Sequence, residues 1–140
     1  MTTVSGAPIE GTADLEVKFF RSEFGTDEIG TTSPTAKVDV NGQILSRVYD
    51  AGSSTVIDWN NGNAQYTSAS CGSFTFSNML DGGNYTLAVN GTTSGTCTFT
   101  HSELTFNFVP SNGATTNGKK TLYTFLRMGA NVYVTWIKGF

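Results

Sequence analysis

Residues 54–89 read STVIDWNNGNAQYTSASCGSFTFSNMLDGGNYTLAV, and this stretch decides the fold. It consists of short runs of β-branched and aromatic residues separated by Gly, Asn, Asp and Ser, which is typical of consecutive antiparallel strands. Because side chains alternate across a strand, Phe74 and Phe76 share one face, as do Tyr85, Leu87 and Val89. The stretch therefore predicts a sheet with one apolar face.

The remainder of the 140-residue chain extends this pattern over a single domain. Only 14% of the residues are charged, and Thr, Gly, Ser and Asn are frequent, which favours strands and turns over helices. The apolar side chains of the strands need a shared interior, which predicts an all-β, antiparallel β-sandwich of about eight strands. The strands are expected at residues 55–59, 64–68, 73–77, 85–89, 96–100, 104–109, 121–128 and 131–137.

Residues 1–50 are predicted to form a short β-rich shaft or linker segment, and residues 51–140 the sandwich itself. Residues 13–20 alternate as a half-buried strand does. Residues 29–42 contain a short alternating run that ends in Asn-Gly, the strongest short hairpin signal, and residues 43–49 resume as a strand.

The interior is expected to hold Phe76, Leu87, Phe99 and Phe106 almost fully buried. Two alternatives stay open for the crowded apolar side chains at the C-terminal end: a thick core with a few exposed aromatics, or a subunit interface. We favour the interface, because large exposed apolar patches are uncommon on monomers. The side chains concerned are Tyr123, Tyr133, Trp136, Ile137 and Phe140.

The two cysteines, Cys71 and Cys97, are compatible with one disulfide or with a pair of buried thiols. Cys97 shares a strand face with Phe99, which predicts that it is buried in either case. The single histidine does not complete a zinc site with them, and we predict no metal and no cofactor.

Charge and hydropathy exclude two classes of partner. The net charge is −3 and the basic residues are scattered along the sequence, which argues against a nucleic-acid surface. No run of about 18 apolar residues is present, so no membrane insertion is expected.

Two features resemble a known group of proteins. Residues 29–42, IGTTSPTAKVDVNG, are similar to the repeat that punctuates long trimeric fibre proteins of bacteria and phages. The later motifs VIDW, NAQYT, FTFSN, DGGNYTL and NVYVTWIKGF resemble the β-sandwich module at the tips of phage tail fibres, and most of all the chimeric fibre adhesins of predatory bacteria. The resemblance implies a homotrimer at the distal end of an extracellular, cell-surface or virion fibre, which recognises bacterial surface glycans.

Binding is expected in the polar loop of residues 109–120. Its side chains can hydrogen-bond sugar hydroxyls without strong charge, so a neutral or weakly charged glycan is expected, and an aromatic platform from Tyr123, Tyr133 or Trp59 would complete such a site. A solvated turn without a binding role is the alternative. The predicted ligand-binding residues are Asn112, Thr115, Asn117, Lys119 and Tyr123.

No catalytic signature is present, and we predict that the chain is not an enzyme. Asp58 is interpreted as a residue that accepts hydrogen bonds from turn amides while Trp59 packs, in preference to a glycosidase carboxylate. A nucleophile in Ser70–Cys71 with His101 as base lacks the surrounding signature. The competing functions are a purely structural fibre module and a tail-fibre or tailspike fragment that cleaves glycans.

Overall fold

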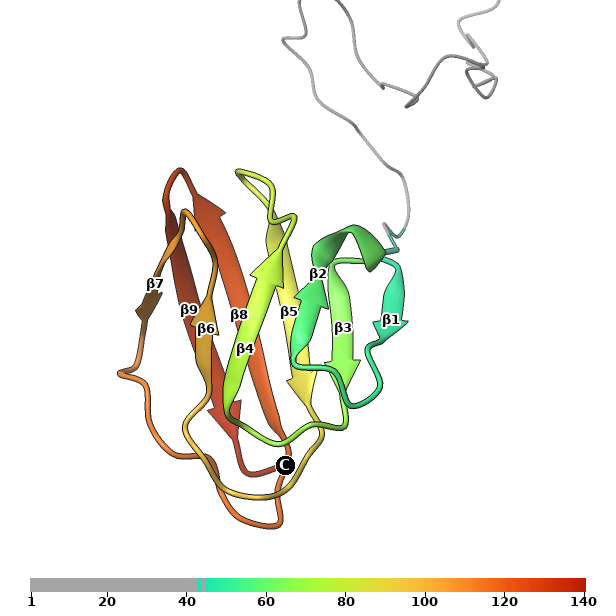
Figure 1. The fold of residues 1–140 in the computed structure, drawn as a ribbon, viewed down its shortest axis with the longest axis vertical. Helices are drawn as coiled ribbons and strands as arrows, with labels where there is room; N and C mark the ends of the chain where they lie inside the picture. Colours follow the sequence, from blue (N-terminus) through green and yellow to red (C-terminus); the bar gives the residue numbers. More distant parts are fainter. Residues whose placement is uncertain (1–42, 44) are drawn as a thin grey trace, which may run out of the picture. The chain divides into compact units, whose positions relative to one another are not determined.

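A computed structural model describes Gln43 and residues 45–140 (Figure 1). The predictions for residues 13–20 and 29–42 lie outside the described residues. Ile44–Phe140 forms a compact unit of its own. Within it the structure is all-β, as predicted, and its elements are β1 (Val48–Asp50), β2 (Val56–Asp58), the 3-10 helix η1 (Trp59–Asn61), β3 (Ala64–Thr67), β4 (Ser73–Ser77), β5 (Asn84–Val89), β6 (Thr98–Thr100), β7 (Thr105–Phe108), β8 (Thr121–Met128) and β9 (Asn131–Lys138).

The strands form two sheets arranged as a β-solenoid. A six-stranded sheet has the order β1-β3-β5-β8-β9-β7, and a three-stranded sheet has the order β2-β4-β6. From β1 to β6 the chain alternates between the two sheets, so each pair of consecutive strands makes one coil of the solenoid (Figure 1). Then β7 joins the far edge of the larger sheet, and the β8–β9 hairpin fills the space between β5 and β7.

The predicted antiparallel pairing is found only between β5 and β8 and between β8 and β9. The other five pairings within the described residues are parallel. Consecutive antiparallel pairing would require the chain to turn back between β2, β3 and β4, but residues 59–63 and 68–72 each carry it across to the opposite sheet. A strand that crosses over returns beside the strand two places earlier and runs in the same direction, which makes the ladder parallel.

A buried polar side chain on β3 stabilises the turn of the first coil. Gln65 is buried on β3, and its Nε2 donates to the carbonyl oxygens of Asp58 at 2.7 Å and Gly62 at 2.9 Å. Gly62 has a φ of 149°, and an added Cβ would meet the backbone of Arg47, so only glycine fits there. These bonds satisfy turn carbonyls that would otherwise be buried without partners.

The core lies between the two sheets. Phe74 and Phe76 on β4 and Leu87 on β5 are at most 3% exposed, which confirms the predicted inward faces. Phe99 on β6 is 6% exposed and stands near the centre of an aromatic cluster, 5.0 Å from Phe76 and 4.9 Å from Phe125 between ring centroids. The interior is therefore held largely by aromatic contacts between β4, β6 and β8.

The prediction that Phe106 is almost fully buried is wrong. Phe106 lies on β7 at the edge of the six-stranded sheet and is half-buried, although its ring is 5.7 Å from that of Phe76. The three-stranded sheet ends at β6, so the strand that follows has no strand of the opposite sheet directly above it.

Candidate functional site

The predicted recognition loop, residues 109–120, connects β7 to β8. It lies at the end of the unit opposite to η1 and the first described residues (Figure 1). Ala114 in the loop forms an antiparallel bridge with Thr96, just before β6. The loop therefore packs along the open edge of the three-stranded sheet.

Two of the predicted site residues hold the loop in place. Asn112 donates from Nδ2 to the carbonyl oxygen of Cys97 at 2.8 Å, and its Oδ1 accepts from the backbone N–H of Gly113 at 2.9 Å. Thr115 is 8% exposed, and its Oγ1 donates to the carbonyl oxygen of Gly95 at 3.0 Å. Both side chains are occupied within the protein.

Two other predicted site residues, Asn117 and Lys119, are exposed. The backbone N–H of Gly118 donates to the carbonyl oxygen of Thr92 at 2.7 Å, which joins this turn to the β5–β6 loop. Together the two turns present exposed hydroxyl, amide and ammonium groups. We call residues 92–94 and 116–119 the tip surface.

Tyr123 does not belong to this surface. It is 0% exposed on the inward face of β8, its hydroxyl lies 3.3 Å from Sγ of Cys71, and burial raises its pKa to about 12. Trp59 is also buried, at 3% exposed, whereas Tyr133 is 46% exposed on the opposite side of the six-stranded sheet. Strand alternation from the buried Phe125 would have placed Tyr123 inside.

Sequence reasoning did not assign Trp136 and Lys138 to the site. Trp136 stacks on Tyr123 with ring centroids 5.9 Å apart, and its Nε1 donates to the carbonyl oxygen of Pro110 at 3.4 Å. Lys138 donates from Nζ to the carbonyl oxygen of Ala114 at 2.9 Å. The signal that could have identified these two residues is the antiparallel register of β8 and β9, which pairs Lys138 with Thr121, directly after the loop.

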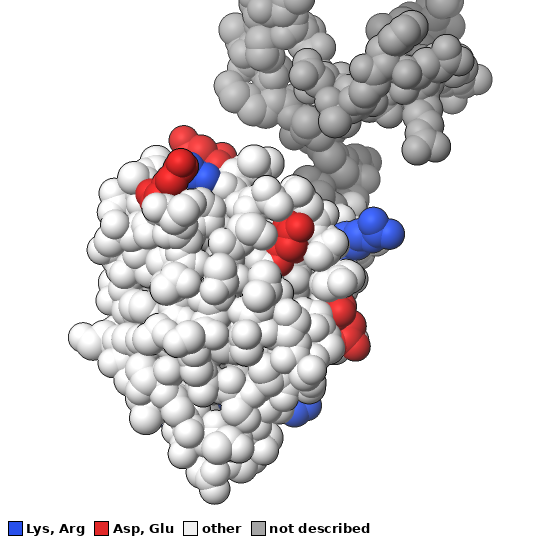
Figure 2. Space-filling view, in the orientation of Figure 1, with Lys and Arg blue, Asp and Glu red and all other residues white. Residues whose placement is uncertain are grey.

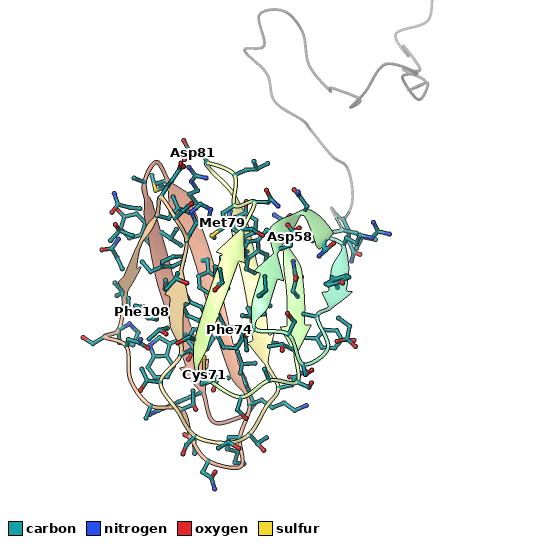
Figure 3. The ribbon with its side chains drawn as sticks, viewed as in Figure 1. Asp58, Cys71, Phe74, Met79, Asp81 and Phe108 are labelled. Carbon is teal, nitrogen blue, oxygen red and sulfur yellow. A yellow bond between two sulfur atoms is a disulfide. The ribbon has the colours of Figure 1, made fainter. Side chains whose placement is uncertain are left out.

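Cys71 and Cys97 form a disulfide, which decides between the two alternatives left open by the sequence (Figure 3). The bond joins the β3–β4 loop to the residue before β6. Cys97 is 0% exposed, as its shared face with Phe99 predicts. Cys97 ends the β5–β6 loop, so the disulfide anchors the loop that carries residues 92–94 of the tip surface.

A second surface is the outer side of the six-stranded sheet, which we call the outer face. On β8 and β9 it pairs Leu122 with Ile137 and Leu126 with Tyr133. Ile137 is 62% exposed and Tyr133 46%. Among the outward-facing residues of the six described strands, only Asp50 carries a charge. Its hydrogen bond and negative charge raise the pKa of the neighbouring Tyr66 hydroxyl.

The candidate catalytic groups are engaged in structural contacts. Oδ1 of Asp58 accepts from Nδ2 of Asn78 at 2.8 Å and from the backbone N–H of Asn60 at 2.9 Å, and these bonds lower the pKa of the carboxyl group. Trp59 packs beside it in the core, as interpreted from the sequence. Cys71 has no free thiol.

His101, the candidate base, lies far from the β3–β4 loop that holds Ser70 and Cys71. Ser70 precedes β4, whereas His101 follows β6. Because β4 and β6 run parallel, the two residues lie at opposite ends of the three-stranded sheet.

The described residues contain neither a cluster of metal-ligating side chains nor a membrane-spanning helix. No group of three or more His, Cys, Asp or Glu side chains is placed to hold a metal ion there. No helix in that part of the chain is long and apolar enough to span a membrane.

Comparison with protein-family models, with curated proteins and with solved structures found no match to this chain. The likeness to trimeric fibre tips therefore stays a hypothesis carried by the motifs.

Proposed function

We propose that this chain is the receptor-binding tip of a homotrimeric surface fibre, related in kind to phage tail fibres and to the fibre adhesins of predatory bacteria. The tip binds bacterial envelope glycans during attachment to a host or prey cell and does not cleave them. It works outside the cell, at the end of a cell-surface or virion fibre.

The observation that carries the proposal is the separation of two ends of the unit. The first described residues lie beside η1, and the tip surface lies at the other end (Figure 1). A chain that arrives from a shaft at one end would present the opposite end to a target. The groups there, Thr92, Thr93, Ser94, Thr116 and Asn117, are exposed hydrogen-bonding side chains suited to sugar hydroxyls.

The disulfide supports the extracellular location. Disulfides such as Cys71–Cys97 form and persist in oxidising surroundings, and they are rare in the reducing cytosol. The second support is the outer face, where exposed apolar side chains are available to pack against other copies of the chain.

We expect a lysine on the outer face to break the trimer without unfolding the subunit. Tyr133→Lys and Ile137→Lys place an ammonium group in an interface that would have to bury it, and both positions are exposed in the single chain. Light scattering should give the mass of three chains for the wild type and of one chain for the double variant. Val56→Lys, at a 60% exposed position on the other sheet, is the matched control. A monomeric wild type at micromolar concentration would refute the trimer.

Adhesion should depend on the tip surface. We expect Thr93→Ala with Asn117→Ala to reduce adhesion to bacterial cells about tenfold or more. Each hydrogen bond to a sugar contributes little on its own, but three linked sites multiply the loss. The measurement is binding of labelled protein to a panel of lipopolysaccharide-bearing and teichoic-acid-bearing cells.

The control for this experiment is Asn60→Ala with Thr75→Ala, which removes the same two side-chain types at exposed positions away from the tip surface. It should adhere as the wild type does. Equal adhesion of the tip variant and the wild type would place the site elsewhere, and a wild type that adheres to no envelope would refute the proposed function.

A second candidate function is a purely structural fibre module. It is favoured by the internal hydrogen bonds of Asn112 and Thr115, which use two predicted ligand-binding side chains to fasten the loop. Under this alternative the wild type forms a trimer but adheres to no cell.

A further inference from the structure

The fold gathers lysines that are far apart in the sequence. Lys119 and Lys120 end the loop before β8, and Lys138 ends β9. The pairing of Thr121 with Lys138, and a bond of 3.2 Å from the backbone N–H of Gly139 to the carbonyl oxygen of Lys120, place them at one end of the hairpin. All three lysines are exposed. We call these three residues the lysine cluster.

The acidic side chains of the described residues lie elsewhere. Asp81 accepts from the backbone N–H of Gly129 at 2.7 Å in the β8–β9 turn, at the other end of the same hairpin. Eight-residue strands separate that turn from the lysine cluster by roughly 25 Å. Glu103 precedes β7 beside the start of β9, and Asp58 ends β2 next to η1.

The remaining acid, Asp50, is three strands away from β8 on the outer face. At about 4.8 Å per strand this is about 14 Å, which exceeds the screening length of about 8 Å at physiological salt. On the side of the molecule in Figure 2, acidic atoms appear at the upper end and along one edge, and none appears at the lower end. The lysine cluster thus has no acidic side chain close enough to neutralise it among the described residues.

The neighbours of the lysine cluster leave its charge available. Lys138 donates one N–H to the carbonyl oxygen of Ala114 and lies 5.5 Å from the ring centroid of Trp136, so two of its three N–H donors have no hydrogen-bond partner among the described residues. Lys119 is part of the tip surface, whose other groups are neutral hydroxyls and amides. The same end of the molecule therefore offers positive charge and sugar-type hydrogen bonding together.

We propose that the ligand of the tip surface is an acidic glycan, whose carboxylate or phosphate groups are bound by Lys119, Lys120 and Lys138 while its hydroxyls bond to the neutral side chains. This inference rests on the proposed function, and it replaces the neutral or weakly charged glycan expected from the sequence.

The test measures binding of the full-length protein to polygalacturonate, to fully methyl-esterified polygalacturonate, to a glycerol-phosphate teichoic acid and to duplex DNA. We expect binding to one or both acidic polymers, at least tenfold weaker binding to the esterified form and to DNA, and weakening as salt rises from 50 to 300 mM. The polygalacturonate and teichoic-acid arms distinguish carboxylate from phosphate.

Variants then test the residues. Lys119→Gln with Lys120→Gln should weaken binding to the acidic polymer about tenfold, since each exposed ion pair contributes modestly, and adding Lys138→Gln should weaken it further. The corresponding Lys→Arg variants should restore binding, and Arg47→Gln, at an exposed cation in the part of the chain before β1, should leave it unchanged. Using the pair without Lys138 avoids disturbing its bond to Ala114.

The outcomes separate the two proposals. Equal, salt-independent binding of acidic and esterified polymers would overturn the acidic-glycan inference and leave glycan recognition standing. Binding of DNA as tight as that of the acidic polymers would also overturn it, because charge alone would then explain the affinity. A protein that binds no glycan here and adheres to no cell would remove the proposed function and the inference with it.

Discussion

Phe76→Ala should lower the free energy of unfolding by about 3 to 5 kcal/mol, the largest effect we expect from any single substitution in the interior. The ring is 3% exposed and lies between both sheets, with centroids 5.3 Å from Trp59, 5.0 Å from Phe99 and 5.0 Å from Phe125. Rigid aromatic neighbours on several sides cannot collapse into the space left by the ring, so the transfer energy of the ring is lost and a cavity remains, which adds to the cost. Chemical denaturation monitored by tryptophan fluorescence measures the change.

Thr75→Ala is the matched control, because Thr75 is the next residue on β4 and its side chain is exposed on the opposite face. Its effect should stay below about 1 kcal/mol. If the two substitutions destabilised the protein equally, the inward face of β4 would be assigned incorrectly.

Removal of the disulfide should cost about 3.5 kcal/mol. The bond closes a loop with a sequence separation of 26 residues, and the chain-entropy model gives this value for a loop of that length. We expect Cys71→Ala with Cys97→Ala to lower the melting temperature strongly. Cys97 is fully buried, so alanine is preferable to serine, which would bury a hydroxyl.

Reduction provides an independent route to the same state. Wild-type protein in excess reductant should melt close to the double variant, and the double variant should not respond to reductant. A wild type whose melting temperature is the same with and without reductant would show that the bond does not constrain the unfolded chain.

Which side chains face inward could be predicted from the sequence, but strand pairing could not. Alternation alone places Phe74, Phe76 and Leu87 in the core, because it depends only on the two-residue repeat of a strand and not on its partners. Whether the chain turns back or crosses to the other sheet at residues 59–63 depends on packing between sheets. Gly and Asn are equally suited to both connections.

The same distinction applies to the candidate site. The loop at residues 109–120 could be recognised by composition, yet its Asn112 and Thr115 are used by the carbonyl oxygens of Cys97 and Gly95, which come from another part of the sequence. The lysine cluster depends on the register of the β8–β9 hairpin, and a shift of one residue would turn Lys138 to the opposite face.

The position of β7 sets an order of assembly during synthesis. Within the described residues β7 is hydrogen-bonded to β9 alone, and β9 is made after β8. A growing chain can stack its first coils as they emerge, since β1 to β4 and β6 pair only with strands made shortly before or after them, and β5 pairs with β3 before β8 is made. The half-buried aromatic strand β7 must wait, with Phe106 and Phe108 uncovered on one side, until nearly the last described residue has left the ribosome. Closure of this unit therefore comes late, after β9 has been made, and the interval before it is when a nascent subunit is most open to wrong partners.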